Sequence, residues 1–259
     1  MAVKFIHMTE TDFLQKKLIH KNCSLENCLD LLKNNHIWFA NPEKWHDPFE
    51  SMFLTTNYKL TSSGITKKHP WHQRVFGTCM TETATCEAYW NIYSQQQIGM
   101  SLAIDREVLL NELKNYSSRT GNTIYIGKVE YQKTSTIVGS LKANPFISPY
   151  LSASGIGTEE AKMRLLLLKR SSYRYEDEIR IFIVKKKKMS LNGIYMDYGC
   201  PPTTLITTIT IDPNVKENVF LMIRERLINQ YHFVDYSPNN KRVRKSLLYT
   251  APKTKMFNI

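Results

Sequence analysis

Short runs of apolar residues recur along the chain between polar turns, and this pattern is typical of β-strands. In several runs, such as "TIYIGKVEYQ", apolar side chains alternate with polar or small ones, so one face of the predicted strand is buried. Other runs, such as "IRIFIV", are apolar almost throughout. We predict strands near residues 4–8, 36–40, 75–80, 99–104, 123–131, 179–184, 205–211 and 231–237.

A second periodicity, with apolar residues three and four positions apart, predicts helices between these strands. The stretch "CSLENCLDLLKNN" is one example, and "TCEAYWNIYSQQQ" is another. A third helix is expected to carry Lys169 and Arg170 in its last turn, where the helix dipole favours cations. The residues suited to cap helix N-termini are Ser24, Asp105, Thr158 and Asp212.

The order of these elements predicts an α+β fold with a largely antiparallel sheet and flanking helices. Strands and helices neither alternate strictly nor separate into two groups. Residues 58–73 and 133–156 are polar or rich in Ser, Pro and Gly, so we expect loops there. A chain of 259 residues with no internal repeat fits one domain, 1–259, with a basic C-terminal tail at 241–259.

Lysine and arginine outnumber the acids, which gives a net charge of +12. A basic surface can steer a protein toward polyanions, so RNA or DNA is a candidate partner. The alternative is that these residues are solvated and serve solubility. The residues that we expect to be exposed and to contact nucleic acid are Lys185, Lys186, Lys187, Lys188, Lys241, Arg242 and Arg244.

The chain has no apolar stretch of the ~18–20 residues that a membrane helix needs, so no membrane partner is expected. It also lacks the pattern of a secretory signal at its start, which favours the cytoplasm. The five cysteines are odd in number and fit no paired framework, so we expect reduced, mostly structural thiols. No cluster of cysteines and histidines has the spacing of a zinc site, and no metal is expected.

The stretch "YEDEIRI" carries the strongest concentration of charge next to an apolar strand. Strand geometry would place Glu176, Glu178 and Arg180 on one face. At a surface such a row would be an ion-pair ladder of small net worth. In a cleft, an arginine would keep a neighbouring carboxylate ionised. We predict that Glu178 is the principal catalytic carboxylate, and that Glu176 is the wetter of the two.

Two aromatic segments are candidates for a binding wall. In "NPEKWHDPFES" the Asp47–Pro48 step either forms a local turn or directs the Asp47 carboxylate into a cavity. In "CEAYWNIYS" the rings of Tyr89, Trp90 and Tyr93 form either a core stripe or a surface on which a flat ring can stack.

Four segments resemble blocks of a bacterial family known as domain of unknown function 2971 (DUF2971). They are "IWFANPEKWHDPFES", "YWNIYSQQQIGMSLAID", "IGKVEYQ" and "LLKRSSYRYEDEIRI", and together they span about residues 36–184. This sequence departs from the family pattern at His46, Tyr89 and Tyr173. The resemblance implies a single domain of this family.

The order of elements also resembles that of ADP-ribosyltransferases, and this second likeness implies an activity. A strand with a histidine, a helix, a short strand and a later strand with a glutamate follow one another as in those enzymes. The resemblance implies that His7 contacts the ribose of NAD, while Trp38, Tyr89, Trp90 or Tyr93 stacks on nicotinamide. Glu178 would then stabilise the charge that develops as nicotinamide leaves.

The sequence therefore leaves three functional hypotheses open. The first is an NAD-dependent ADP-ribosyltransferase, acting as a toxin or an anti-phage defence effector with an antitoxin or another protein as partner. The second is a nucleic-acid-binding protein without chemistry. The third is a metal-dependent nuclease, for which Asp47, Glu50, Glu176 and Glu178 would supply carboxylates. The acceptor of a transferred group could be protein, nucleic acid, a small molecule or water.

Overall fold

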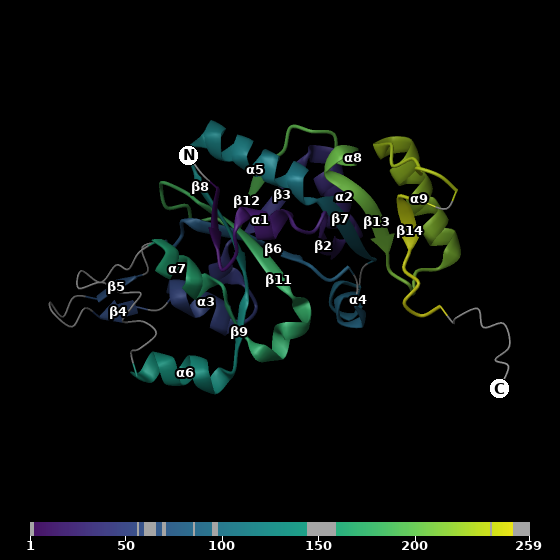
Figure 1. Cartoon of the computed structure of the whole chain (residues 1–259). Coiled ribbons are helices and arrows are strands. Elements are labelled where there is room, and N and C mark those ends of the chain that lie inside the picture. The colour runs from purple at the N-terminus through teal and green to yellow at the C-terminus, as the bar shows by residue number, and fades with distance from the viewer. Residues whose placement is uncertain are drawn as a thin grey trace, which may run out of the picture.

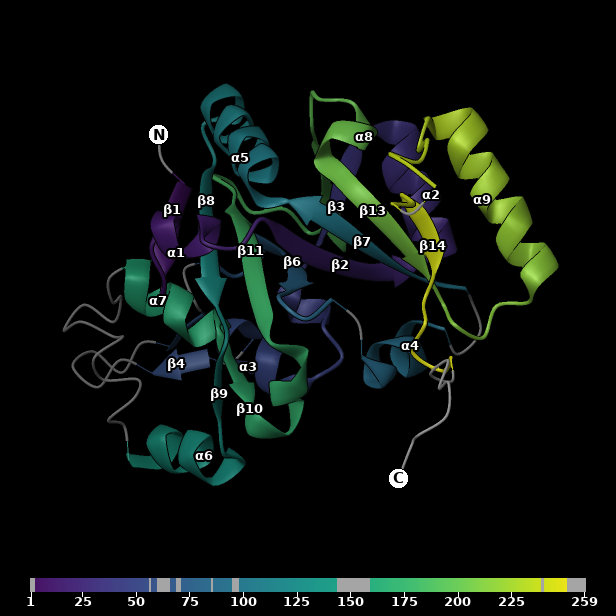
Figure 2. The same cartoon turned by 45° about the vertical axis from the view of Figure 1, so that its right-hand side comes forward.

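One ten-stranded sheet organises the computed structural model, which describes residues 3–55, 57–59, 66–68, 71–84, 86–94, 98–143, 159–238 and 240–250. Figure 2 shows its strands from the N-terminal edge to the C-terminal edge. The order is β1 (Val3–Ile6), β8 (Thr123–Lys128), β11 (Glu178–Val184), β6 (Val75–Thr81), β2 (Leu18–Ser24), β7 (Gly99–Asp105), β13 (Ile206–Ile211) and β14 (Val243–Lys245).

The sheet is mostly antiparallel. Among neighbours in this order, β1–β8 and β13–β14 run parallel and the others run antiparallel. The remaining two strands, β3 (His36–Ala40) and β12 (Gly193–Asp197), pair with each other, and β3 also contacts β6. The predicted α+β class with a largely antiparallel sheet is therefore confirmed.

Helices cover both faces of the sheet. The larger core packs one face against α1 (Glu10–Leu14), α2 (Leu25–Asn34), α5 (Arg106–Thr120) and α9 (Glu217–Tyr231). A smaller core packs the other face of β8 and β11 against α3 (Pro48–Thr55) and α7 (Glu159–Leu166). Figure 1 shows α9 beside β14 at one end of the molecule and α3 and α7 toward the other.

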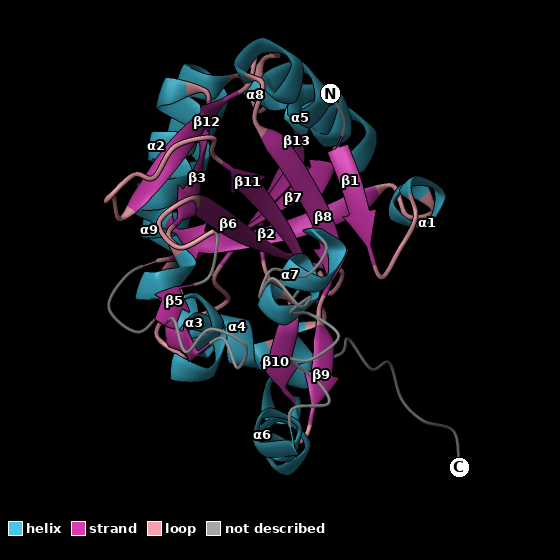
Figure 3. Cartoon of the chain, turned by 90° about the vertical axis from the view of Figure 1, so that its left-hand side faces the viewer, coloured by secondary structure: helices cyan, strands magenta, loops and turns pink. Residues whose placement is uncertain are grey.

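Shorter elements complete the described chain. Two strands, β9 (Glu130–Gln132) and β10 (Leu168–Arg170), form a parallel pair that lies below the main sheet in Figure 3. The 3₁₀ helix η2 (Ser171–Glu176) joins β10 to β11. The others are η1 (Pro42–Lys44), β4 (Asn57–Lys59), β5 (Thr66–Lys68), α4 (Glu87–Tyr93), α6 (Thr134–Ala143) and α8 (Pro202–Leu205).

Local sequence signals placed several helix ends correctly. The Ser24 hydroxyl accepts a hydrogen bond from the backbone N–H of Asn27, and the Asp105 carboxylate accepts one from Val108, so both residues cap helices as predicted. The helix expected after Asp212 begins later, at Glu217, because the Asp212 side chain instead accepts the N–H of Asn214 in a turn. Thr158 lies outside the described residues.

Other predictions were wrong where tertiary pairing overrode local pattern. Lys169 and Arg170 belong to β10 and not to a helix end. Residues 231–237 form no regular strand because α9 continues to Tyr231. The loops expected at 58–73 and 133–156 contain β5 and α6 within their described parts. No described helix is long and apolar enough to span a membrane.

The sheet divides at one edge of β6. At Thr81 this edge pairs with His20 of β2, and at Gly77 it pairs with Ala40 of β3. Between these points residues 78–80 pair with β11 on one side and with no described strand on the other. Backbone N–H and C=O groups at this edge are therefore free to bond a ligand. The division opens a cleft between β2 and β3.

Gly77 is required at this division because no side chain fits there. A Cβ atom at Gly77 would lie 2.7 Å from the Phe182 ring and 3.1 Å from the Trp45 ring. We expect Gly77→Ala to lower the free energy of unfolding by about 1–3 kcal/mol through overpacking. The midpoint of urea unfolding measures this change.

The matched control is Gly199→Ala, since a Cβ there would meet its nearest neighbouring atom at 3.8 Å. A Gly77→Ala protein as stable as this control would contradict the packing described here.

Candidate active site

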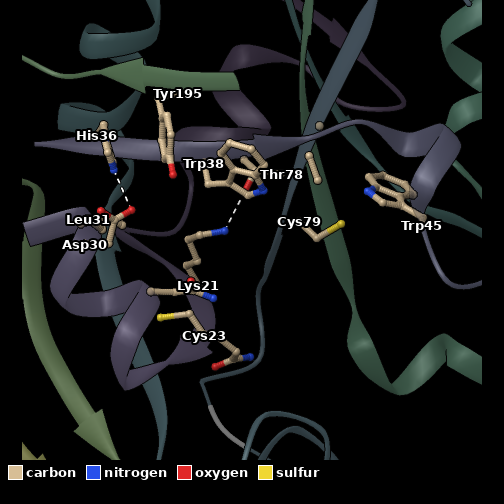
Figure 4. A pocket seen from close by; sticks show the side chains of 14 residues that line it. Lys21, Cys23, Asp30, Leu31, His36, Trp38, Trp45, Thr78, Cys79 and Tyr195 are labelled. Atoms are coloured by element: carbon tan, nitrogen blue, oxygen red, sulfur yellow. Dashed lines mark hydrogen bonds and ion pairs between the residues drawn. The ribbon is translucent and has the colours of Figure 1, made fainter. Parts of the chain in front are cut away.

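The cleft between β2 and β3 is the main cavity beside β6, with a volume of about 340 Å³. Figure 4 shows side chains from β2, α2, β3, β6 and β12 pointing into it. Its lining residues are Lys21, Asn22, Cys23, Asn27, Asp30, Leu31, His36, Trp38, Ala40, Trp45, Gly77, Thr78, Cys79 and Tyr195.

Polar groups lie on the floor of this cleft. The Lys21 ammonium donates a hydrogen bond to the Thr78 hydroxyl at 2.7 Å (Figure 4). Burial lowers the pKa of Lys21 below its ordinary value. At the far end, His36 Nε2 lies 2.8 Å from a carboxylate oxygen of Asp30, which lowers the pKa of that carboxyl. The floor thus offers a cation next to hydrogen-bonding groups.

Aromatic rings form the walls. The ring of Tyr195 stacks on His36 with centroids 3.9 Å apart, and it lies 4.7 Å from the ring of Trp38. Trp38 is 40% exposed, so part of its surface is free to contact a ligand. Aromatic walls around a polar floor suit a ligand with a flat ring and a charged or hydroxylated part.

A narrow extension leads from the cleft to Glu178. It shares Asn22 and Cys79 with the cleft, and its other lining residues are His20, Met80, Thr81, Tyr89 and Glu178. Its volume is about 20 Å³, which is room for about one water molecule. Burial raises the pKa of Cys79 to about 12, so this cysteine remains a thiol and is not an activated nucleophile.

Strand register sets Glu178 and His20 in one row. Glu178 pairs with Thr81, and Thr81 pairs with His20 on its other side. Residues directly opposite in neighbouring strands share a face of the sheet. Because each strand lies about 4.8 Å from the next, Glu178 and His20 lie about 10 Å apart along the sheet. A histidine and a carboxylate from distant parts of the chain thus flank the same extension.

Glu178 belongs to a buried cluster of five charged side chains. Arg180, which is fully buried, donates to Glu178 at 2.8 Å and to Glu50 at 2.7 Å. Lys169 contacts Glu50 at 3.1 Å and Glu178 at 3.2 Å, and it also donates to Glu176. The Trp45 ring lies 4.7 Å from the Arg180 guanidinium. This cluster joins α3, β10, η2 and β11.

The cluster has three carboxyl groups and two cations, and the pKa values follow from this count. Burial opposes ionisation of Glu178, but Arg180 and Lys169 outweigh it and hold the pKa of Glu178 below its ordinary value. Burial and the neighbouring Glu178 carboxylate raise the pKa of Glu176 to about 8. With a proton on Glu176 the cluster is neutral, and Glu178 is its fixed anion.

Glu176 belongs to a different secondary-structure element from the predicted one. It lies in η2 and not in β11, and Asp177 has a left-handed backbone with φ 41° between the two glutamates. The strand alternation inferred for Glu176 is therefore wrong, although Glu178 and Arg180 do share a face. Both glutamates are buried, and Glu176 is slightly the more exposed of the two, at 9% against 8%.

The other predicted site residues do not all converge. His7 follows β1, where its Nδ1 lies 3.3 Å from the carbonyl oxygen of Lys128, on the side of β11 away from the cleft. Its predicted place in the cleft is wrong because β1 pairs with β8 and not with β6. Asp47 is buried but forms an ion pair with Arg170 at 3.1 Å and accepts the N–H of Phe49, as a local turn does.

Of the predicted aromatic residues, Trp38 lines the cleft and Tyr89 lines the extension. The Tyr89 hydroxyl donates to the Glu176 carbonyl oxygen and lies 3.0 Å from the Thr81 hydroxyl. Trp90 is buried in the helix α4. Tyr93 ends α4, and its side chain lies outside the described residues.

The predicted basic residues divide into exposed and buried groups. Lys186, Lys187 and Lys188 are exposed, as is Lys241. Lys185 is half-buried and donates to the Tyr116 hydroxyl at 3.3 Å.

Arg242 was expected at the surface, and that expectation is wrong. It is buried, and its guanidinium donates to three backbone carbonyl oxygens, those of Thr203, Ile206 and Thr207. Arg244 is exposed beside β13, where its Nε lies 3.3 Å from the Thr210 hydroxyl.

Sequence reasoning missed the strand that carries most of the cleft. β2, "LIHKNCS", brings His20, Lys21 and Asn22 to the site, yet no strand was predicted there. Its one signal was the pair Ile19 and Cys23, which is buried in the core on the face opposite to His20. Tyr195 was also missed, since β12 is a short strand with no strong pattern of its own.

The raised pKa of Glu176 predicts a pH-dependent stability. A carboxyl whose pKa is higher in the folded state stabilises the fold fully below its unfolded pKa, about 4.5, and this contribution is lost as the pH rises to about 8. Wild-type stability should therefore fall over this range. Glu176→Gln, which stays neutral, should lose this part of the slope. Urea unfolding midpoints at a series of pH values measure it.

The control for this prediction is Glu160→Gln, an exposed carboxyl paired with Arg164, which should keep the wild-type profile. If Glu176→Gln follows the wild-type slope across the whole range, the proton does not reside on Glu176.

Comparison with known proteins gives one match. The model of a family described as a protein of unknown function (DUF2971) matches residues 89–181, less than half of the chain. No curated protein and no solved structure matches. The matched segment contains Tyr89 and, near its end, Glu176, Glu178 and Arg180. The chain therefore resembles the DUF2971 family over residues 89–181, and the resemblance includes much of the buried ion cluster.

Proposed function

We propose that this protein is an NAD-dependent ADP-ribosyltransferase that binds NAD in the cleft between β2 and β3. The observation that carries the proposal is the in-register row of Glu178, Thr81 and His20, because it places a fixed anion at the end of an aromatic cleft. In this proposal the cleft binds NAD, and the buried ion cluster holds the Glu178 carboxylate ionised.

The cleft has the groups that NAD requires. The Trp38 and Tyr195 rings provide flat surfaces for an adenine or nicotinamide ring. The Lys21 ammonium provides a positive charge for the pyrophosphate. The unpaired edge of β6 at residues 78–80 provides N–H and C=O groups that match a carboxamide.

In the proposed reaction the bond between C1 of the ribose and the ring nitrogen of nicotinamide breaks. The electron pair goes to the ring, so nicotinamide leaves as a neutral molecule, and positive charge develops on the ribose. An acceptor oxygen then gives an electron pair to C1 and loses its proton to solvent. Glu178, held ionised by Arg180 and Lys169, stabilises the positive charge. Each Glu178 oxygen keeps a lone pair for a ribose hydroxyl.

Access to Glu178 requires a movement near α4. The extension holds about one water molecule, and the Tyr89 side chain closes part of it. In the proposed complex Tyr89 moves outward as the ribose enters, and it then covers the reacting bond from water. An enzyme that consumes NAD or modifies cell components harms its host, which fits a toxin or an anti-phage effector kept in check by a partner.

The alternative of a metal-dependent nuclease has less support. The carboxylates considered for Mg²⁺ are already neutralised by cations, because Glu50 and Glu178 pair with Arg180 and Lys169, and Asp47 pairs with Arg170. Among the described residues no group of three or more potential ligands is arranged to hold a metal ion.

Replacement of Glu178 by Gln tests the proposal. Gln keeps the shape but removes the charge, so NAD cleavage should fall on the order of a hundredfold or more, with the affinity for NAD nearly unchanged. The rate of nicotinamide release and the dissociation constant for NAD are the two measurements. Melting temperatures show whether the variant is folded.

Glu82→Gln is the matched control. Glu82 also pairs with an arginine and a lysine, Arg106 at 2.7 Å and Lys128 at 2.8 Å, but it does not line the cleft or its extension. This variant should cleave NAD at the wild-type rate. A folded Glu178→Gln protein with full activity, or a wild-type protein that neither binds nor cleaves NAD, would refute the proposal.

A further inference from the structure

A second hollow lies on the other side of His20 from Glu178. It has a volume of about 260 Å³, and its lining residues are His20, Ala84, Ala103, Thr210, Arg244, Lys245, Ser246 and Leu247. Two of these residues are cations, three others carry hydroxyl or imidazole groups, and none is a carboxylate. We call this cavity the basic hollow.

The basic hollow adjoins the extension of the candidate active site at one residue. His20 lines both the basic hollow and the extension that contains Glu178. In the register, His20 pairs with Ala103 of β7, and Thr210 of β13 pairs with Arg244 of β14. The side chains of Ala103 and Thr210, which line the hollow from β7 and β13, are short, and they are 5% and 9% exposed. His20 lies about 10 Å from Glu178, and a molecule in the basic hollow lies beyond His20, over β7 and β13.

The electrostatics of the basic hollow favour an anion. Burial, together with the charges of Arg106 and Arg244, lowers the pKa of His20 to about 4. His20 is therefore neutral at neutral pH. Lys245 lies 3.8 Å from an exposed carboxylate, Glu217, and this distance leaves its charge largely available.

The flanks of the basic hollow match a nucleic-acid strand. Leu247 and Tyr249 follow β14 and are 76% and 50% exposed, so apolar and aromatic surface adjoins the cations. Aromatic rings beside a basic groove bind single strands because bases stack on them while cations hold the phosphates. The net charge of +12 adds a general attraction for polyanions.

We propose that the basic hollow binds a phosphate of a single-stranded nucleic acid and thereby holds this strand as the acceptor of the ADP-ribosyl group. The role of this strand as acceptor rests on the proposed function, whereas binding of the strand does not depend on it. Arg244 and Lys245 contact the phosphate, and His20 stands between the phosphate and Glu178.

Binding of short fluorescein-labelled single-stranded RNA and DNA, followed by fluorescence polarisation over a range of salt, tests this proposal. The variant is Arg244→Glu with Lys245→Glu. Its affinity should fall about tenfold or more, and the dependence on salt should become shallower, since fewer counterions are released. Inorganic phosphate should compete with the strand in the wild-type protein.

The matched control is Lys186→Glu with Lys187→Glu, which makes the same change of charge at exposed residues outside the basic hollow. It should bind within about twofold of wild type if the contact is local. Equal weakening in both double variants would overturn the proposal in favour of a general charge effect. Unchanged binding in the Arg244 and Lys245 variant would overturn it as well.

A separate assay distinguishes this proposal from the proposed function. Nicotinamide release into water, without nucleic acid, should be the same in wild type and in the Arg244 and Lys245 variant. If wild type binds the strand through the basic hollow but never cleaves NAD, the proposed function fails and the binding site stands. The double variant could lose strand binding because it is destabilised, which a melting temperature well below wild type would show. Arg244→Gln, which keeps a hydrogen-bonding group beside Thr210, should then still weaken strand binding. Unchanged strand binding by Arg244→Gln overturns the proposal.

Discussion

A guanidinium that is completely removed from water must be neutralised where it lies, and Arg180 imposes this constraint on the molecule. Its partners come from segments far apart in sequence: Glu50 from α3 and Glu178 from the start of β11. Lys169 of β10 joins both carboxylates. Loss of one partner would leave an unpaired buried charge, which typically costs about 3–5 kcal/mol. The cluster therefore fixes how these segments pack.

The same constraint positions the candidate chemistry. Because Glu178 is held by two cations, it stays ionised although it is almost fully buried. Because it begins β11, its register with Thr81 and His20 aims it at the extension of the cleft. The cleft itself has a separate cause: β6 pairs with β2 at one point and with β3 at another, which separates the two strands. The fixed Glu178 carboxylate therefore lies at the end of the cleft between β2 and β3.

Much of the fold could be predicted because its strands carry strong local patterns, as "IRIFIV" and "TIYIGKVEYQ" do. Glu178 and Arg180 could be recognised for the same reason, since alternation in a strand is a local property. Lys169 and Glu50 could not be recognised as their partners, because the contacts depend on tertiary packing. His20 was missed because β2 is interrupted by polar residues that face the cleft.

The most direct test of this account is a crystal structure of the protein with a non-cleavable NAD analogue. The account predicts that the analogue lies in the cleft between β2 and β3, with a ring against Trp38 and its nicotinamide ribose hydroxyls within hydrogen-bond distance of Glu178. Tyr89 should be displaced from the position that it has here. An analogue that binds elsewhere, or that occupies the cleft with its nicotinamide ribose far from Glu178, would contradict the account.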